Sequence, residues 1–176
     1  MNEKYCKIFT LKLTESYERI DSKLQSGKFL LNGNYYILDV YMANKNNLMS
    51  KLNSINDLQD YLIIRDYNNE NKELILFSDG VFRGEVKGIF STKEIVQKLD
   101  YLELFNINQE VFIYIKDDIR IKVVNVRNLG IFIEYENEED ILSIENLLKE
   151  LKIEYIASKD NYVDLSFNNY IKGKNL

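Results

Sequence analysis

The sequence contains no histidine, no proline and no tryptophan, and it has a single cysteine. Without histidine there can be no Ser-His-Asp triad, no imidazole general base and no histidine-ligated zinc or iron. One cysteine cannot form an intrachain disulfide or a cysteine-rich metal site. The remaining chemistry rests on carboxylates, lysine, arginine, tyrosine and serine. A metal ion, if one is used, should therefore be a hard ion held by oxygen atoms, such as Mg²⁺ or Mn²⁺.

The chain has 176 residues, of which 45% are hydrophobic. This length and composition suit one packed domain over residues 1–176. The 28 acidic and 23 basic residues give a net charge of −5, which argues against a nonspecific nucleic-acid partner, because such proteins need a basic face. No stretch approaches the roughly 20 apolar residues of a membrane-spanning helix, and the charged start does not resemble a signal peptide. We therefore expect a cytoplasmic protein without a membrane partner.

Strand-like patterns dominate the chain. The predicted strands are residues 4–13, 35–42, 60–67, 73–78, 81–89, 109–116, 119–126, 131–136 and 154–157. Asp79-Gly80 predicts a tight hairpin between two of them. Helices are expected over residues 14–24, 91–102 and 138–151, with Thr14 and Ser91 capping the first two. Hairpin-linked antiparallel strands with a few helices predict an α+β fold, and apolar residues on both faces favour a closed or strongly curved sheet.

Charged residues alternate with apolar ones inside several of these strands. They are Arg65, Arg83, Glu85, Lys87, Arg120, Lys122, Glu134 and Glu136. One interpretation is a sheet with a solvated face of mixed charge. The other is a barrel lumen in which Arg and Lys hold phosphate oxygens and carboxylates hold a divalent cation. The residues alone leave both interpretations open.

The segment Asn128–Glu136, with the pattern Leu-Gly-Ile-Phe-Ile-Glu-Tyr-Glu, resembles the late strand of the CYTH family, also called triphosphate tunnel metalloenzymes. Further segments resemble other strands of that family in the same order. They are Leu38–Tyr41, Leu62–Arg65, Arg83–Glu85 and Lys159–Leu165. The C-terminal half is most similar to the class IV adenylyl cyclase and thiamine-triphosphatase branches.

This resemblance implies an antiparallel eight-stranded β-barrel, the triphosphate tunnel, with helices packed outside. It implies a triphosphate or nucleotide ligand, Mg²⁺ or Mn²⁺ as cofactor, and either triphosphate hydrolysis or ATP cyclisation. Under it, Glu85, Glu134 and Glu136 would be the metal ligands. The phosphate-binding residues would be Lys7, Arg65, Arg83, Lys87, Arg120 and Lys122. A homodimer is plausible by the same analogy.

The sequence also departs from the family pattern. The first-strand signature Glu-x-Glu-x-Lys has its nearest candidate in Glu3–Lys7, where Tyr5 replaces the middle glutamate. Expected charged positions fall on apolar residues or glutamine, namely Ile63, Phe77, Gln109, Val111 and Val124. A triphosphate carries about four negative charges, and its desolvation must be offset by several cations.

Three functional hypotheses therefore remain, and none identifies a catalytic residue. The protein is a metal-dependent triphosphatase or adenylyl cyclase with a reduced tunnel, or it is a catalytically inactive module that binds a nucleotide or phosphorylated metabolite. Under the third hypothesis, side chains fill the barrel, and the protein has a structural role or binds other proteins.

Overall fold

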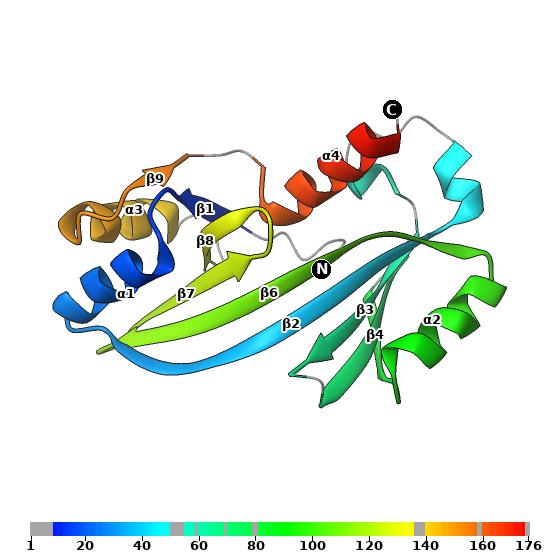
Figure 1. Ribbon diagram of the computed structural model, residues 1–176, viewed down its shortest axis with the longest axis horizontal. Helices are drawn as coiled ribbons and strands as arrows, with labels where there is room; N and C mark the ends of the chain where they lie inside the picture. The colour runs from blue at the N-terminus through cyan, green and yellow to red at the C-terminus, as the bar shows by residue number, and fades with distance from the viewer. Residues whose placement is uncertain are drawn as a thin grey trace. The chain divides into compact units, whose positions relative to one another are not determined.

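The computed structural model describes residues 9–49, 55–58, 60–68, 70–78, 81–135, 140–157 and 160–174. Figure 1 shows their arrangement as strands and helices. In chain order the elements are β1 (Phe9–Leu13), α1 (Tyr17–Ser26), β2 (Leu30–Asn44), the 3₁₀ helices η1 (Lys45–Met49) and η2 (Ile55–Asp57), β3 (Tyr61–Tyr67), β4 (Asn71–Phe77), β5 (Val81–Glu85), α2 (Ile89–Lys98), β6 (Tyr101–Lys116), β7 (Ile119–Val126), β8 (Gly130–Tyr135), α3 (Ile141–Glu150), β9 (Tyr155–Ile156) and α4 (Tyr162–Lys174).

The nine strands of the described residues are hydrogen-bonded in the order β5-β4-β3-β2-β6-β7-β8-β1-β9. Neighbours for which a register is defined run antiparallel. This confirms the predicted α+β fold with an antiparallel sheet and helices beside it. In this order β5 and the two-residue β9 are the end strands.

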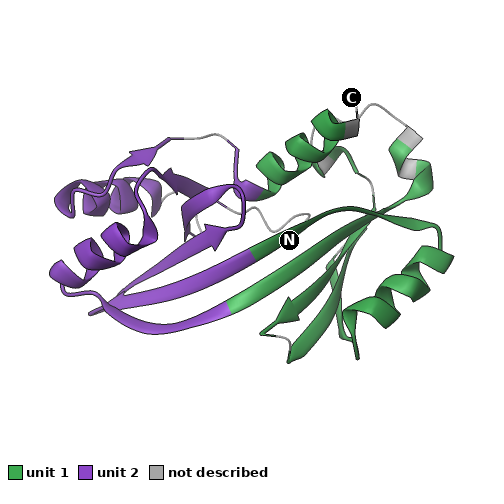
Figure 2. Cartoon of the chain, viewed as in Figure 1, with its two compact units in different colours: residues 1–6, 36–108, 163–176 green, residues 7–35, 109–162 purple. Residues whose placement is uncertain are grey.

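The chain divides into two compact units (Figure 2). Among the described residues, unit 1 takes 36–108 and 163–174, and unit 2 takes 9–35 and 109–162. The long strands β2 and β6 each continue from one unit into the other. A single domain over the whole chain stays a prediction.

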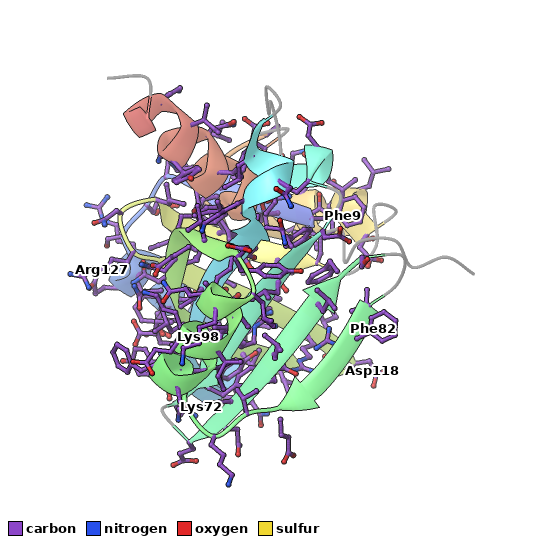
Figure 3. The ribbon with its side chains drawn as sticks, turned by 90° about the vertical axis from the view of Figure 1, so that its right-hand side faces the viewer. Phe9, Lys72, Phe82, Lys98, Asp118 and Arg127 are labelled. Carbon is purple, nitrogen blue, oxygen red and sulfur yellow. The ribbon has the colours of Figure 1, made fainter. Side chains whose placement is uncertain are left out.

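In unit 1, helix α2 packs against one face of the strands β2, β3 and β4. Its buried residue Val96 joins Val40, Met42, Leu62 and Ile64 in an apolar cluster. These positions alternate along β2 and β3, as expected where side chains two apart share a face. Phe82 of the end strand β5 is 63% exposed and projects outward in Figure 3.

The opposite face of the unit 1 strands carries a stack of aromatic rings. Tyr41 stacks on Phe105 with ring centroids 4.6 Å apart, and Tyr61 stacks on Phe77 at the same separation. Phe167 of α4 meets Phe105 edge-on at 6.2 Å. Offset and edge-on contacts of this kind add stability beyond the area they bury, so α4 is held to this end of the sheet by aromatic packing.

In unit 2, helices α1 and α3 share one face of the strands β1, β6, β7 and β8. The cluster beneath them includes Leu11, Ile20, Leu24, Val123 and Leu148, which are all at most 1% exposed. Ile20 and Leu24 are one helical turn apart, which places both on the face of α1 that meets the strands. The other face of β1, β7 and β8 carries the polar residues considered below.

The element boundaries differ from the sequence prediction mainly at caps and turns. Helix α1 begins after Ser16 rather than Thr14, and α2 begins after the extended Gly88, so Ser91 lies inside the helix and donates to the Gly88 carbonyl. Strands β2 and β6 begin earlier than predicted, at Leu30 and Tyr101. In the described part of the chain, no helix combines the length and apolarity that crossing a membrane requires.

Candidate functional site

Four charged side chains form one row across the strands of unit 1. Asp39, Arg65, Glu73 and Glu85 are direct neighbours on β2, β3, β4 and β5. Because residues in register share a face, all four belong to the face opposite α2. Arg65 and Glu85 belong to the set predicted from the sequence, whereas Asp39 and Glu73 do not. The row places Arg65 between two carboxylates.

Arg65 is engaged by one of these carboxylates. Its Nε lies 2.6 Å from Asp39 Oδ1, and its Nη2 lies 2.7 Å from Asp39 Oδ2, while Asp39 is only 1% exposed. Burial alone would lower the pKa of Arg65, but the hydrogen bonds and charge of Asp39 outweigh it and raise this pKa further above its usual value. Asp39 thus occupies the Nε–Nη2 edge of the guanidinium, one of the edges that can hold a phosphate in bidentate fashion, while Nη1 lies 3.4 Å from the Tyr67 hydroxyl.

At the other end of this row, around Glu73 and Glu85, the charged side chains are more exposed to solvent. Tyr67 donates to Glu73 Oε1 at 3.1 Å, and Arg83 Nη1 approaches the same oxygen at 3.5 Å. The Arg83 side chain is 51% exposed, and the predicted residues Glu85 and Lys87 are also exposed. Arg83 therefore balances a protein carboxylate at the surface of unit 1.

In unit 2, Glu134 on β8 is held between a cation and a phenol. Lys122, its neighbour on β7, lies 2.5 Å from Oε1, and the hydroxyl of Tyr162 donates to Oε2 at 2.7 Å. Tyr162 is 2% exposed, so its hydroxyl is fixed by packing as well as by this hydrogen bond. Both carboxylate oxygens of Glu134 thus have protein donors, and the charge of Lys122 is offset locally.

The first strand contributes residues that the sequence analysis did not single out. Thr10 is the neighbour of Glu134 on β1, and Lys12 is the neighbour of Phe132. The Lys12 ammonium lies 5.9 Å from the centre of the Phe132 ring, in range for a cation–π interaction. The predicted first-strand candidates, Glu3 and Lys7, lie outside the described residues. In the sequence, the alternation of Thr10 and Lys12 with Phe9, Leu11 and Leu13 is the pattern that could have identified these two residues.

The positions at which the family pattern expects charge are buried here. Ile63 and Phe77 are 4% and 5% exposed in unit 1, and Val111 and Val124 are fully buried in unit 2. By register, Val111, Val124 and Phe132 form the row beside Lys122 and Glu134. Apolar side chains therefore pack beside Lys122 and Glu134, where the family pattern expects charged side chains.

A pocket of about 590 Å³ opens beside Lys122 and Glu134 within unit 2. Its lining residues come from β2, β7, β8 and the start of α3, and they are Tyr35, Ile119, Arg120, Ile121, Lys122, Ile133, Glu134, Tyr135, Asp140, Ser143, Ile144 and Leu147. Pockets of roughly 300–1,000 Å³ with an apolar lining and a few polar groups are typical of small-molecule sites. Here two cations, Arg120 and Lys122, two carboxylates, Glu134 and Asp140, and two tyrosines adjoin an apolar wall.

The described residues contain no preformed cluster of metal ligands. Glu134 already accepts from Lys122 and Tyr162, and Glu85 is exposed on β5. Glu136, the third predicted ligand, lies outside the described residues. Where the structure describes the chain, no three acidic or cysteine side chains gather closely enough to hold a metal. Mg²⁺ is usually held by one or two protein carboxylates together with waters and substrate phosphates, so the described carboxylates by themselves offer no preformed metal cage.

The fold is shared with several solved structures. PH1819 from Pyrococcus horikoshii OT3 superimposes with a TM-score of 0.65 at 19% identity, covering 93% of this chain and 98% of that chain. HpAC1 from Hippeastrum, a candidate adenylyl cyclase with a dominant triphosphatase activity, gives 0.61 at 15% identity, covering 94% and 95%. A chain of the Schizosaccharomyces pombe Mediator head module gives 0.51 at 11% identity, covering 81% and 94%.

At these low identities the likeness shows the fold alone. The sequence itself matches no family model and no curated protein. The fold thus occurs both in a protein with triphosphatase activity and in a chain of a multiprotein assembly.

Proposed function

We propose that this protein binds a nucleotide or another small molecule carrying a triphosphate in the pocket of unit 2, and that binding needs no metal ion. The observation that carries the proposal is the pocket of about 590 Å³ beside Arg120 and Lys122. Arg120 is exposed and Lys122 is half-buried. Both line the pocket where β7 begins, with Lys122 and Glu134 on the opposite face of the strands from Ile121, Ile133 and α3. Phosphate oxygens are the natural partners of such cations.

The other walls of the pocket suit the rest of a nucleotide. Tyr35 and Tyr135 offer aromatic surface on which a base can stack. Ile121, Ile133 and Ile144 supply apolar contact, and Ser143 supplies a hydroxyl. Support for a phosphorylated ligand also comes from the fold shared with HpAC1, whose dominant activity acts on a triphosphate.

We expect binding without a metal ion because Glu134, which a metal ion would need as a ligand, is already paired with a lysine. Glu134, the described member of the predicted metal-ligand set in unit 2, is neutralised by Lys122 at 2.5 Å. A ligand phosphate that approaches Lys122 therefore competes with Glu134 for the same ammonium group. In unit 1, Arg65 is already paired with Asp39, so it is a less available phosphate ligand than the sequence suggested.

A second candidate function is hydrolysis of a triphosphate, favoured by the fold shared with HpAC1. It would need more carboxylates than the described residues bring together. Glu85, Arg83 and Lys87 stay candidates for such a site, as do Lys7 and Glu136 outside the described residues. No catalytic step is assigned to any of them.

One experiment separates these functions. Heat-induced unfolding and calorimetric titration would be measured with ATP, thiamine triphosphate and tripolyphosphate, each with EDTA, Mg²⁺ or Mn²⁺. Release of phosphate or cyclic nucleotide would be followed in the same samples. We expect saturable binding in EDTA without product. Binding that requires a metal and yields product would establish the enzyme instead, and the absence of all binding would leave the interaction module.

A further inference from the structure

The first part of β2 is an open edge of the sheet in unit 2. Strand β2 begins at Leu30, but β3 pairs only with the later part of it, Ile37–Ala43. Among the described strands, residues 30–35 therefore have β6 as their one neighbour. Figure 2 shows this part of β2 as the outermost strand of unit 2. We call residues 30–35 the β2 edge.

Backbone donors and acceptors of the β2 edge point away from β6. The Tyr36 N–H donates to Asn68 Oδ1 at 2.7 Å, and the Tyr36 carbonyl accepts from the Asn68 N–H at 3.0 Å, so both groups of Tyr36 point to the side of β3. Backbone groups alternate between the two sides of a strand, so those of Leu30, Asn32 and Asn34 point the same way. No described strand lies on that side to meet them.

The β2 edge also lacks the features that usually keep an edge strand from pairing. Natural edges carry charged side chains or proline, whereas residues 30–35 read Leu-Leu-Asn-Gly-Asn-Tyr. Leu30 is 73% exposed and Leu31 is 47% exposed. Beside Gly33, a side chain would meet nothing within 4 Å. An exposed, uncharged edge of this kind can accept a further strand from another chain.

A pocket of about 900 Å³ lies at the start of the β2 edge. Its lining residues all belong to unit 2, and they are Ser26, Gly27, Lys28, Leu30, Leu31, Asn32, Ile115, Lys116 and Asp117. The Lys116 ammonium lies 5.4 Å from the centre of the buried Phe29 ring. In the described part of the chain, no ion pair involves Lys28 or Lys116. The pocket thus offers two ammonium groups against the one carboxylate of Asp117.

We propose that the β2 edge binds an extended segment of a partner protein, which adds a strand of about six residues to the sheet of unit 2. The main chain of this segment bonds to the outward backbone groups of Leu30, Asn32 and Asn34. Acidic side chains at one end of the segment enter the pocket and meet Lys28 and Lys116. Main-chain bonds supply affinity, and the two lysines select the acidic sequence.

A second copy of this chain does not supply that charge. If two β2 edges paired with each other about a two-fold axis, residues 30–35 of one copy would lie against residues 30–35 of the other. These six residues contain no carboxylate, so the paired edges would give Lys28 and Lys116 no acidic partner. The pairing of charge therefore favours a different, acidic segment as the occupant.

The test uses synthetic nine-residue peptides and the full chain. Each peptide has a core of alternating Val and Thr, with Asp-Glu or Lys-Lys at its N-terminal or its C-terminal end. Fluorescence anisotropy measures their binding. We expect saturable binding of an Asp-Glu peptide in at least one of the two orientations, and binding at least about fivefold weaker for the Lys-Lys peptide of the same orientation. The bound Asp-Glu peptide should also slow amide hydrogen exchange in residues 30–35.

Two sets of variants separate the contributions of backbone and charge. Asn32→Pro removes an outward N–H and leaves the β6 side of the strand intact, as edge strands tolerate, so it should weaken binding by about fivefold. Asn32→Ala is the matched control: it keeps the N–H and should bind within about twofold of the parent. The double variant Lys28→Glu and Lys116→Glu should reverse the preference between the Asp-Glu and Lys-Lys peptides, and this readout does not depend on the proline variant.

Three results would overturn the proposal. The first is the absence of saturable binding by either Asp-Glu peptide. The second is equal binding of the Asp-Glu and Lys-Lys peptides, or equal binding by Asn32→Pro and Asn32→Ala. The third is a dimer mass in sedimentation that Asn32→Pro abolishes, since this would make a second copy the occupant of the β2 edge.

Discussion

The carboxylate of Asp39 receives two hydrogen bonds from the guanidinium of Arg65, at 2.6 Å and 2.7 Å, in a position where Asp39 is 1% exposed. The two residues are direct neighbours on β2 and β3. This pair uses the Nε and Nη2 donors of Arg65, which the family resemblance would assign to a phosphate. It is also the ion pair of unit 1 whose loss should be most costly.

Asp39→Ala should destabilise the protein by about 3–5 kcal/mol, because it leaves the largely buried Arg65 charge without its partner. Urea unfolding at neutral pH measures the change. Lys45→Ala is the matched control: it breaks the Lys45–Asp100 pair, whose side chains are 50% and 69% exposed, and should cost at most about 1 kcal/mol. Equal losses in the two variants would contradict the structural role of the Asp39–Arg65 pair.

Glu134→Gln should strengthen the binding of ATP or tripolyphosphate in EDTA, because it removes the protein anion that competes for Lys122. We expect a gain of about fivefold, in line with the strength of a partly exposed ion pair. Lys122→Met should weaken binding by at least as much. Calorimetric titration measures both variants. If Glu134 instead served as a required metal ligand, Glu134→Gln would abolish binding.

The control for this change is Glu150→Gln, which alters the net charge equally at an exposed position on α3. It should leave the affinity within about twofold, since an exposed charge away from the pocket is largely screened. A similar gain in Glu150→Gln and Glu134→Gln would show that net charge alone, and no specific site, governs binding.

Stability should fall as the pH rises above about 10, because of a hydrogen-bonded pair of tyrosines, one buried and one partly buried. Tyr114 is fully buried, bonds to the Tyr17 hydroxyl at 2.9 Å and donates to Asp21 at 2.7 Å. Burial first, and then these contacts, raise the pKa of Tyr114 above its usual value of 10.0, and burial also raises the pKa of Tyr17. The folded chain therefore keeps protons that the unfolded chain loses, so the stability present below pH 10 declines above it.

Urea unfolding between pH 7 and about 11 would measure this decline. Tyr114→Phe should have a shallower alkaline slope than the parent protein, although its stability at pH 7 should be lower by about 1–3 kcal/mol because Asp21 loses a donor. Identical alkaline slopes in the two proteins would contradict the assignment to Tyr114.

On the acidic side, Glu15 should contribute a loss of stability as the pH falls. Burial acts to raise the pKa of Glu15, but hydrogen bonds from Lys23 at 2.5 Å and from the backbone N–H of Glu154 at 2.8 Å lower this pKa below its usual value of 4.5. The folded carboxylate is thus the better stabilised form, and its contribution is present above about pH 4.5 and is lost as the pH falls through the lowered pKa. The stability difference between the parent protein and Glu15→Gln should shrink from pH 6 to pH 3.

The strands and the family-like fold could be predicted, because they depend on the local alternation of apolar and polar residues. The Phe9–Leu13 and Ile119–Val126 patterns place their residues on the correct faces, and the antiparallel α+β class follows from many hairpin-linked strands. The α4 helix was not predicted, because Tyr162–Lys174 mixes aromatic, polar and charged residues without a clear apolar stripe. It is held by Phe167 against Phe105, a contact between residues 62 positions apart in the chain.

The residues of the candidate site were harder to predict, because the register of neighbouring strands decides which charged side chains form pairs. Arg65 reads as a free phosphate ligand in the sequence, and only the alignment of β2 with β3 shows that Asp39 occupies its guanidinium. Glu134 likewise reads as a metal ligand, until Lys122 and Tyr162 are found on its two oxygens. Tyr162 and Glu134 are 28 residues apart, and no local pattern links them.

The continuity of β2 and β6 through both units has a consequence for dissection of the chain. Unit 2 takes one segment before residue 36 and another after residue 108, and the last segment of unit 1 follows residue 162. No single backbone cleavage can therefore release either unit as an intact fragment. Truncation from either end removes strands or helices of one unit while leaving partial strands of the other, so the shortest fragment expected to fold is close to the complete chain.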